Sequence, residues 1–326
     1  MRRRASQACR TTATPQECHD SRSKPSDIAP LKEVVTGPYK RFGWWSLVRD
    51  TLRSPRLSYA FYLTNNTVSI PDHDIAQREH AQFVSVLRET GVIVRTLDAI
   101  DDVSVQLHPR DIAFAVDDVL FLARSADPVR RREQRALIPL LAEVSRVVPL
   151  DDGHIEGGDV IVTDDVVFVG LSEATDLKGV GSLRQAFARA GIDREIVPIE
   201  FSHRGVVHLD TKLTLVGPGL GYIYSPSLTL RSREKVAERL DLIEASEAKA
   251  LALMVNTLAL APDRIVIDER ATRLEQELSS RGITPVPVKF SEVTRFPGGF
   301  RCATLPLVRS VVSTADSPGS RSSRTS

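Results

Sequence analysis

Four short segments of the sequence carry polar residues in otherwise apolar surroundings. They are His108–Asp111, Ile155–Asp159, Val207–Thr211 and Pro297–Thr304. Together they supply a thiol, an imidazole and several carboxylates, each placed before or beside an expected strand. If the fold brings the four segments together, this set of groups is suited to attack on the carbon of a guanidinium.

A guanidinium is planar, cationic and chemically stable, which sets what an enzyme must provide. Carboxylates can grip its N–H groups through charge-assisted bidentate hydrogen bonds. A thiolate is a soft nucleophile that can reach the central carbon. An imidazole can protonate the leaving amine and then deprotonate the incoming water or amine. The bound cation would itself lower the pKa of the thiol through its charge.

The composition argues against several other classes of function. The 326 residues include 43 Lys and Arg against 42 Asp and Glu, so a net charge of +1 gives no reason to expect a nucleic acid or an anionic membrane as partner. No apolar run approaches the roughly 18 residues of a membrane span. The three cysteines form no disulfide framework, which favours a reducing, cytoplasmic location. No Cys-x-x-Cys or His-Glu-x-x-His spacing indicates a metal site, and no cofactor is predicted.

Both ends of the chain differ in composition from the rest. Residues 1–30 are rich in Arg, Ser, Thr and Pro without apolar periodicity, and residues 314–326 are rich in Ser and Arg. We expect both to be disordered tails. An organelle transit peptide is the alternative for the first segment, but Glu17 and Asp20 are unusual in such peptides. Residues 31–313 are therefore expected to form a single catalytic domain.

A pattern of strand, loop, helix and strand repeats along this domain. At spacings of roughly 45–55 residues, the expected copies begin near Thr67, Val119, Val166, Tyr222 and Ile265. The clearest copy contains a helix that stops at Gly191. The copy that begins at Tyr222 is expected to contain a longer helical segment between Ser232 and Leu251.

Two fold classes alternate strands and helices in this way. A doubly wound parallel sheet is one of them, but no Gly-rich phosphate loop follows the first strand. Extra strand-like segments at Ile112–Val116 and Lys212–Val216 also give more than one strand per helix. We therefore predict an α/β fold built as a five-bladed propeller of ββαβ units. Loops from every unit would converge at the centre of such a ring.

Taken in order, the four segments resemble the fingerprint of a superfamily of guanidino-group-modifying enzymes. The superfamily includes arginine deiminases, dimethylarginine dimethylaminohydrolases and amidinotransferases, and the resemblance implies a five-bladed αβ propeller. Similarity extends over roughly residues 100–310, with a weaker N-terminal unit from about Leu31. The motif Gly-Gly-x-x-Cys-x-Thr that ends at Thr304 adds specificity to the match.

The resemblance implies a role for each matching residue. Cys302 would be the nucleophile and His208 the general acid and base, while Glu156 would orient His208 or bind the substrate. Asp111 and Asp210 would grip the guanidinium nitrogens. Each has a structural alternative, such as a buried apolar cysteine, a core pair of His208 with Asp210, a turn at Glu156 or an ion pair at Asp111.

Other residues are assigned secondary roles. Arg124 is a candidate to bind a substrate carboxylate, with a structural salt bridge as the alternative. Asn256 matches a family asparagine near the active site that has a more structural role. His154 and His203 are expected to be surface loop residues. Trp44 and Trp45 are expected to be packing or lid residues.

The sequence gives conflicting indications about the second half of the reaction. Ile155–Asp159 and Arg130–Glu133 resemble the hydrolases, whereas Pro109–Asp111 and Val216–Gly219 resemble the amidinotransferases. We favour a hydrolase, in which water releases the amidino group. The alternatives are an amidinotransferase with an amine acceptor and a non-catalytic propeller that only binds. The expected partner is a small guanidine such as arginine, and the oligomeric state is left open.

Two positions depart from the family pattern. Hydrolases of the family commonly carry an arginine for the substrate α-carboxylate where Ala174 stands. Many relatives also have a histidine where Arg301 precedes the cysteine. The first departure argues against free L-arginine as a standard substrate, unless Arg124 or another cation takes over the carboxylate.

Overall fold

Five three-stranded sheets form the frame of the computed structural model, which describes residues 24–53, 69–296 and 298–310. The strands are β1 (Leu31–Thr36), β2 (Ile93–Thr96), β3 (Ala113–Val116), β4 (Val119–Leu122), β5 (Val147–Pro149), β6 (Val160–Val162), β7 (Val166–Leu171), β8 (Glu195–Glu200), β9 (Leu213–Gly217), β10 (Leu220–Ile223), β11 (Asp241–Glu244), β12 (Leu258–Ala261), β13 (Arg264–Asp268), β14 (Thr284–Val288) and β15 (Thr304–Arg309). The helices are α1 (Trp44–Arg53), α3 (His73–Glu89), α4 (Pro128–Glu133), α5 (Ile138–Leu141), α6 (Leu177–Ala190), α7 (Leu230–Ala237), α8 (Glu247–Leu251) and α9 (Thr272–Ser280).

Every sheet has the same internal pattern. The sheets are β15-β1-β2, β3-β4-β5, β6-β7-β8, β9-β10-β11 and β12-β13-β14. In each, the middle strand pairs antiparallel with the first strand and parallel with the last. An antiparallel pair can be joined by a tight turn, whereas a parallel pair needs a longer crossover, which a helix supplies here. The predicted α/β propeller of ββαβ units is confirmed.

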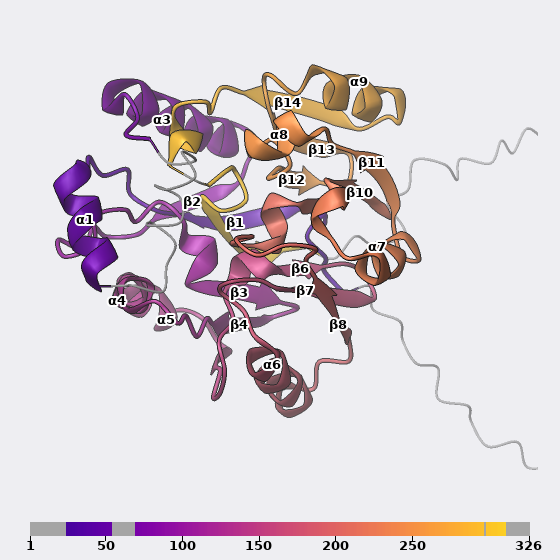
Figure 1. Ribbon diagram of the computed structural model, residues 1–326, viewed down its shortest axis with the longest axis horizontal. Helices are drawn as coiled ribbons and strands as arrows, with labels where there is room; N and C mark the ends of the chain where they lie inside the picture. The colour runs from indigo at the N-terminus through magenta and orange to yellow at the C-terminus, as the bar shows by residue number, and fades with distance from the viewer. Residues whose placement is uncertain (1–23, 54–68, 297, 311–326) are drawn as a thin grey trace, which may run out of the picture.

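The ring is closed by strands from opposite ends of the described chain. β15 pairs antiparallel with β1, with Val35 opposite Leu305, so the first unit takes its first strand from the C-terminal end. Figure 1 shows the strands towards the middle of the molecule and α3, α6, α7 and α9 around the outside. Of the helices in the described ranges, none is both long and apolar enough to cross a membrane.

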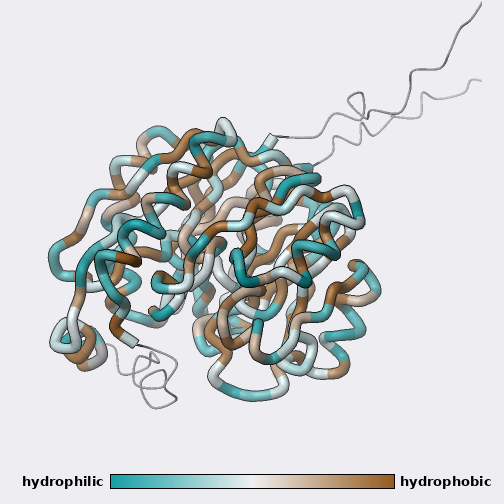
Figure 2. Tube along the Cα trace, turned by 90° about the horizontal axis from the view of Figure 1, so that it is seen from above, coloured by the Kyte–Doolittle hydropathy of each residue, from teal (hydrophilic) through white to brown (hydrophobic). Residues whose placement is uncertain are grey.

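Helix α6 illustrates why these sequences form the outer layer. The carboxylate of Asp176 caps its start by accepting a hydrogen bond from the Gly179 N–H. Gly191 ends it at φ +70°, a conformation that glycine adopts without steric cost, as predicted from the sequence. Its buried residues Leu183 and Phe187 pack in one apolar cluster with strands β6, β7 and β8. In Figure 2, brown hydrophobic stretches run through the interior, while teal hydrophilic residues are common on the outer helices and loops.

Two predicted elements differ in the structure. The strand expected at Thr67–Ile70 is wrong in its described part, because Ser69 and Ile70 lie outside any strand, and the rest falls outside the described residues. The corresponding strand of the first sheet is β1, which begins at Leu31, where the sequence showed a weaker N-terminal similarity to the superfamily. The helix expected between Ser232 and Leu251 is instead α7 and α8, separated by β11, because this stretch must also supply the parallel partner of β10.

The start of the folded part also differs from the predicted tail of residues 1–30. Residues 26–29 are buried, and Ile28 belongs to the largest apolar cluster. The Asp27 N–H donates to the Val162 carbonyl at 2.8 Å, and the Asp27 carboxylate accepts from the Val162 N–H at 2.9 Å. This segment is therefore held against the end of β6. The remaining tail predictions, for residues 1–23 and 314–326, fall outside the described residues.

Candidate active site

The chemically important residues lie in turns that precede the first strand of each unit. Single 3₁₀ turns, η1 (Pro109–Asp111), η3 (Gly157–Asp159) and η4 (Leu209–Thr211), lead into β3, β6 and β9. Asn256 and Cys302 lie in the turns before β12 and β15. η1 contacts η3 and β15, and η3 contacts η4. The described parts of the four polar segments are thus brought together at one end of these strands.

His208 forms a pair with Glu156. Its Nε2 lies 2.9 Å from Glu156 Oε2, and its Nδ1 lies 3.5 Å from Asp111 Oδ1. All three side chains are buried. Burial alone would lower the pKa of His208, but the charges of Asp111, Glu156 and Asp159 outweigh it and raise the pKa to about 10. The imidazole is therefore protonated at neutral pH and can donate a proton to a leaving group.

The neighbours of this pair fix its geometry. A Cβ added to Gly158 would lie 2.6 Å from His208 Cγ and Nδ1, so a larger residue would displace the ring. Ser125 Oγ donates a hydrogen bond to Glu156 Oε1. The Glu156 N–H donates to Thr175 Oγ1 at 3.2 Å. Close packing against the imidazole thus explains Gly158, while a Cβ at Gly157 would lie 2.2 Å from the Arg110 carbonyl oxygen.

Cys302 is buried beside Asp210 and Asn256. Its Sγ lies 3.6 and 3.7 Å from the two carboxylate oxygens of Asp210, and Asn256 Nδ2 donates to it at 3.2 Å. Asn256 Oδ1 also accepts from the Cys302 N–H at 3.0 Å, and Nδ2 donates to the Asp210 carbonyl at 3.0 Å. Burial, Asp210 and Asp111 raise the pKa of the Cys302 thiol well above its ordinary value. Forming the thiolate therefore requires added positive charge nearby.

Each predicted guanidinium ligand has an arginine neighbour. Arg130 Nη2 lies 3.1 Å from Asp111 Oδ2, and Arg301 Nε lies 3.6 Å from Asp210 Oδ2. Asp111 Oδ1 is buried and has no hydrogen bond within the described ranges. Burial and Asp111 raise the pKa of Asp210, while Arg301 opposes them. The two carboxylates therefore keep acceptor capacity for the N–H groups of a cation.

Arg124 lies apart from these contacts. Its side chain is exposed, and its Nε donates to the Gly153 carbonyl at 2.9 Å. Its backbone bridges to Ile155, one residue before Glu156, so it is close to the site along the chain. No ion pair joins it to another described residue within 4.0 Å. Its predicted role at a substrate carboxylate stays a prediction.

Asp159 is a buried residue of the site to which no role was assigned from the sequence. Ser172 Oγ and Thr175 Oγ1 each donate to its carboxylate at 2.6 Å, and the Leu209 N–H donates at 2.9 Å. Burial raises the pKa of Asp159 to about 7 despite these bonds. Asp159 thus ties η3 to η4, the turn that follows His208. Asp159 lies in the same motif as Glu156, and this was the feature of the sequence that could have indicated its place in the site.

The acidic groups around His208 also have the spacing of metal ligands. One ligand atom each from Asp111, Glu156 and His208 lies within 4.8 Å of the others, which could hold a metal ion. The N–H groups of a bound guanidinium would use the same carboxylate acceptors. The absence of a metal, expected from the sequence motifs, stays a prediction.

A comparison with protein families agrees with this arrangement. Residues 66–309 match a family model described as N,N dimethylarginine dimethylhydrolase, eukaryotic. The chain belongs to this family. The guanidino-modifying superfamily inferred from the four motifs is thereby confirmed.

This dimethylarginine hydrolase family member has relatives in sequence and similar solved structures. The uncharacterized protein YkgA of Bacillus subtilis is 32% identical over 235 residues, which are 72% of this chain and 80% of that protein. Arginine deiminase of Listeria monocytogenes is 27% identical over 246 residues, and the match spans 61% of this chain and 60% of the deiminase. The inosamine-phosphate amidinotransferase of Streptomyces griseus has a TM-score of 0.73 at 19% identity, covering 88% of this chain and 97% of that structure, which shows a shared fold.

Proposed function

We propose that this protein hydrolyses an arginine-like guanidine through a covalent intermediate on Cys302. The observation that carries the proposal is one buried cluster in which the thiol of Cys302 and the pair of His208 with Glu156 lie beside the carboxylates of Asp111 and Asp210. Family membership supports guanidine chemistry, and the arginine deiminase relative favours water as the acceptor.

The proposed reaction has two halves. The Cys302 thiolate attacks the guanidinium carbon, and protonated His208 donates its proton to the nitrogen that leaves as an amine. The C–N bond breaks and an amidino-thioether remains on the sulfur. Neutral His208 then takes a proton from water, which attacks the same carbon. Collapse of that adduct breaks the C–S bond, releases a ureido product and restores the thiolate.

Charge explains how the nucleophile forms. Burial and the charges of Asp210 and Asp111 hold the pKa of the Cys302 thiol high. A guanidinium bound between them offsets their negative charge and adds a cation beside the sulfur, so the thiol pKa falls when substrate is present. The protein is therefore expected to activate Cys302 chiefly in the substrate complex.

The substrate is proposed to be arginine or an arginine-like guanidine. Ala174 is buried, and its N–H donates to Ser172 Oγ at 3.0 Å, so this position offers no cation for a substrate carboxylate. Arg124 is the proposed substitute, since it is exposed and lies next to Ser125, the hydrogen-bond partner of Glu156. A substrate without an α-carboxylate would need no cation at this position.

An amidinotransferase is the alternative, because it shares the first half-reaction and this fold. Incubation with arginine and with N-methylated arginines, with and without glycine or lysine as acceptor, separates the two. We expect a ureido product and released amine in the absence of any acceptor. Strict dependence on an added amine would replace the hydrolase proposal with the transferase. The absence of turnover and of any adduct with all of these guanidines would favour a non-catalytic binding protein.

A cationic alkylating agent is expected to inactivate the protein faster than a neutral agent of similar size. Chloroacetamidine is attracted by Asp111 and Asp210 and lowers the thiol pKa, whereas chloroacetamide does neither. We expect a preference of roughly ten-fold or more at pH 7, which corresponds to ~1.4 kcal/mol, after correction for reaction with a small thiol. Mass spectrometry of Cys302 measures both rates.

The same pair of agents tests the pH dependence. Because the pKa of the Cys302 thiol is raised, the neutral agent should react faster as the pH rises and the thiolate fraction grows. The ratio of the inactivation rate with chloroacetamidine to that with chloroacetamide should therefore fall as the pH rises. Equal corrected rates at pH 7, or a neutral-agent rate that is flat between about pH 7 and 10, would contradict the charge argument.

A further inference from the structure

Two arginines inside the ring have no carboxylate of their own. Arg110, in η1, is 3% exposed, and its Nε and Nη2 have no hydrogen-bond partner within the described ranges. Arg309, at the end of β15, donates from Nη1 and Nη2 to the Ala29 and Ala259 carbonyls, while its buried Nε has no such partner. Neither side chain forms an ion pair with a described acidic residue within 4.0 Å. Arg309 is partly exposed, whereas Arg110 is buried, and burying an unpaired charge is costly.

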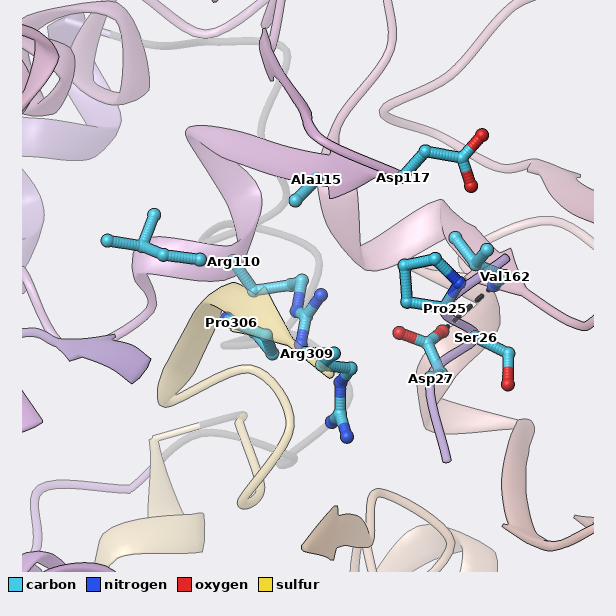
Figure 3. A pocket seen from close by; sticks show the side chains of 10 residues that line it. Pro25, Ser26, Asp27, Arg110, Ala115, Asp117, Val162, Pro306 and Arg309 are labelled. Atoms are coloured by element: carbon cyan, nitrogen blue, oxygen red, sulfur yellow. Dashed lines mark hydrogen bonds between the residues drawn. The ribbon is translucent and has the colours of Figure 1, made fainter. Parts of the chain in front are cut away.

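Both arginines line one small cavity. It lies where β3, β6 and β15 end, and Arg110 reaches it from η1, the turn that also carries Asp111. Figure 3 shows the guanidinium groups of Arg110 and Arg309 on one side and the carboxylate of Asp27 on the other. The cavity measures about 20 Å³, which is room for one water-sized particle.

The carboxylates that line the cavity are already engaged. Asp27 Oδ2 lies 2.9 Å from Arg301 Nη2 and accepts from the Val162 N–H. Asp117 accepts hydrogen bonds from Arg194 Nε and Nη2 at 2.9 and 2.7 Å. These two acids therefore neutralise other arginines.

The charges that act on Arg110 show the imbalance. The largest of them come from Arg301, Asp27, Asp210 and Arg309, and together with Arg110 this group holds three guanidiniums and two carboxylates. Burial, followed by the charge of Arg301, lowers the pKa of Arg110 to about 9. Burial likewise lowers the pKa of Arg309 to about 10. One negative charge at the cavity would remove this imbalance.

We propose that the cavity is a binding site for a single inorganic anion of halide size, held by the guanidinium groups of Arg110 and Arg309. The N–H groups without partners supply the donors, and the surplus positive charge supplies the sign. The small volume favours a halide over phosphate, sulfate and carboxylate metabolites, all of which are larger than a water molecule. The proposal does not depend on which guanidine reaction the protein performs.

Bromide provides the direct test, because it resembles chloride and scatters anomalously. Crystals of the full chain soaked in bromide are expected to show an anomalous peak in contact with both Arg110 and Arg309. Bromide at surface sites only, with a neutral water in this cavity, would overturn the proposal.

Stability in solution provides the second test. At constant ionic strength, replacing gluconate by chloride is expected to raise Tm by roughly 2 °C or more, because a ligand that binds only the folded state stabilises it. Arg309→Gln should lose this response. Arg264→Gln is the matched control, since Arg264 is exposed at the start of β13 and does not line the cavity. The proposal would be contradicted if chloride raised Tm equally in the wild-type protein and in both variants. A bromide peak in the cavity without any stabilisation by chloride would also contradict it.

Discussion

Replacement of Cys302 by alanine is expected to lower kcat for guanidine hydrolysis by roughly 10⁴-fold or more, because no other group can form the covalent intermediate. The fold should survive, since the change removes only one sulfur atom from a small buried side chain. The Asn256 side chain would keep its bonds to the backbone of residue 302 and to the Asp210 carbonyl.

The other two cysteines give matched controls for this change. Cys9→Ala and Cys18→Ala remove the same functional group from the N-terminal segment and should leave turnover unchanged. Steady-state kinetics, with Tm measured alongside, tests all three variants. Turnover above about a hundredth of the wild-type rate in folded Cys302→Ala would exclude this residue as the nucleophile.

Replacement of His208 by alanine is expected to reduce kcat by about 10²–10⁴-fold, because the imidazole serves as acid in one half-reaction and as base in the other. The loss should depend on the leaving group. An amine cannot leave easily without a proton, whereas the thiolate of an S-methyl isothiourea can. With such a substrate the variant should complete the first half-reaction and stall before hydrolysis.

A nearby histidine provides the control for His208. His203 is exposed in the loop before η4, and its Nδ1 bonds Ser202 Oγ at 3.1 Å. His203→Ala should retain turnover. If His208→Ala releases product from the isothiourea at the wild-type rate, water activation belongs to another group and the assignment fails.

The features that a local pattern of residues specifies could be predicted from the sequence. Each polar motif stands just before the first strand of a unit, and this position together with the repeated strand–helix pattern predicted that the motifs would meet in a ring. The capped helix ending at Gly191 was likewise visible from residue types. The meeting of the four motifs is a consequence of repeating one ββαβ unit five times.

The features that were missed depend on contacts between distant residues. β1 is a strand of the first unit because β15, from the other end of the described chain, pairs with it. Asp27 belongs to the fold because Arg301 and Val162 bind it, and nothing in residues 24–30 alone announces those partners. β11 has charged residues at both ends, Asp241 and Glu244, and lies between two helices, so periodicity did not separate it from them.

The central claim is that the guanidine carbon becomes bonded to Cys302, and intact-mass spectrometry of the stalled His208→Ala variant tests it most directly. After incubation with an S-methyl isothiourea analogue of arginine, the account predicts one adduct per chain, with the mass of the substrate minus methanethiol. Peptide mapping should place it on Cys302, and the Cys302→Ala protein should acquire none. An adduct on Cys9 or Cys18, or an unmodified chain despite turnover of the analogue by the wild-type protein, would contradict the account.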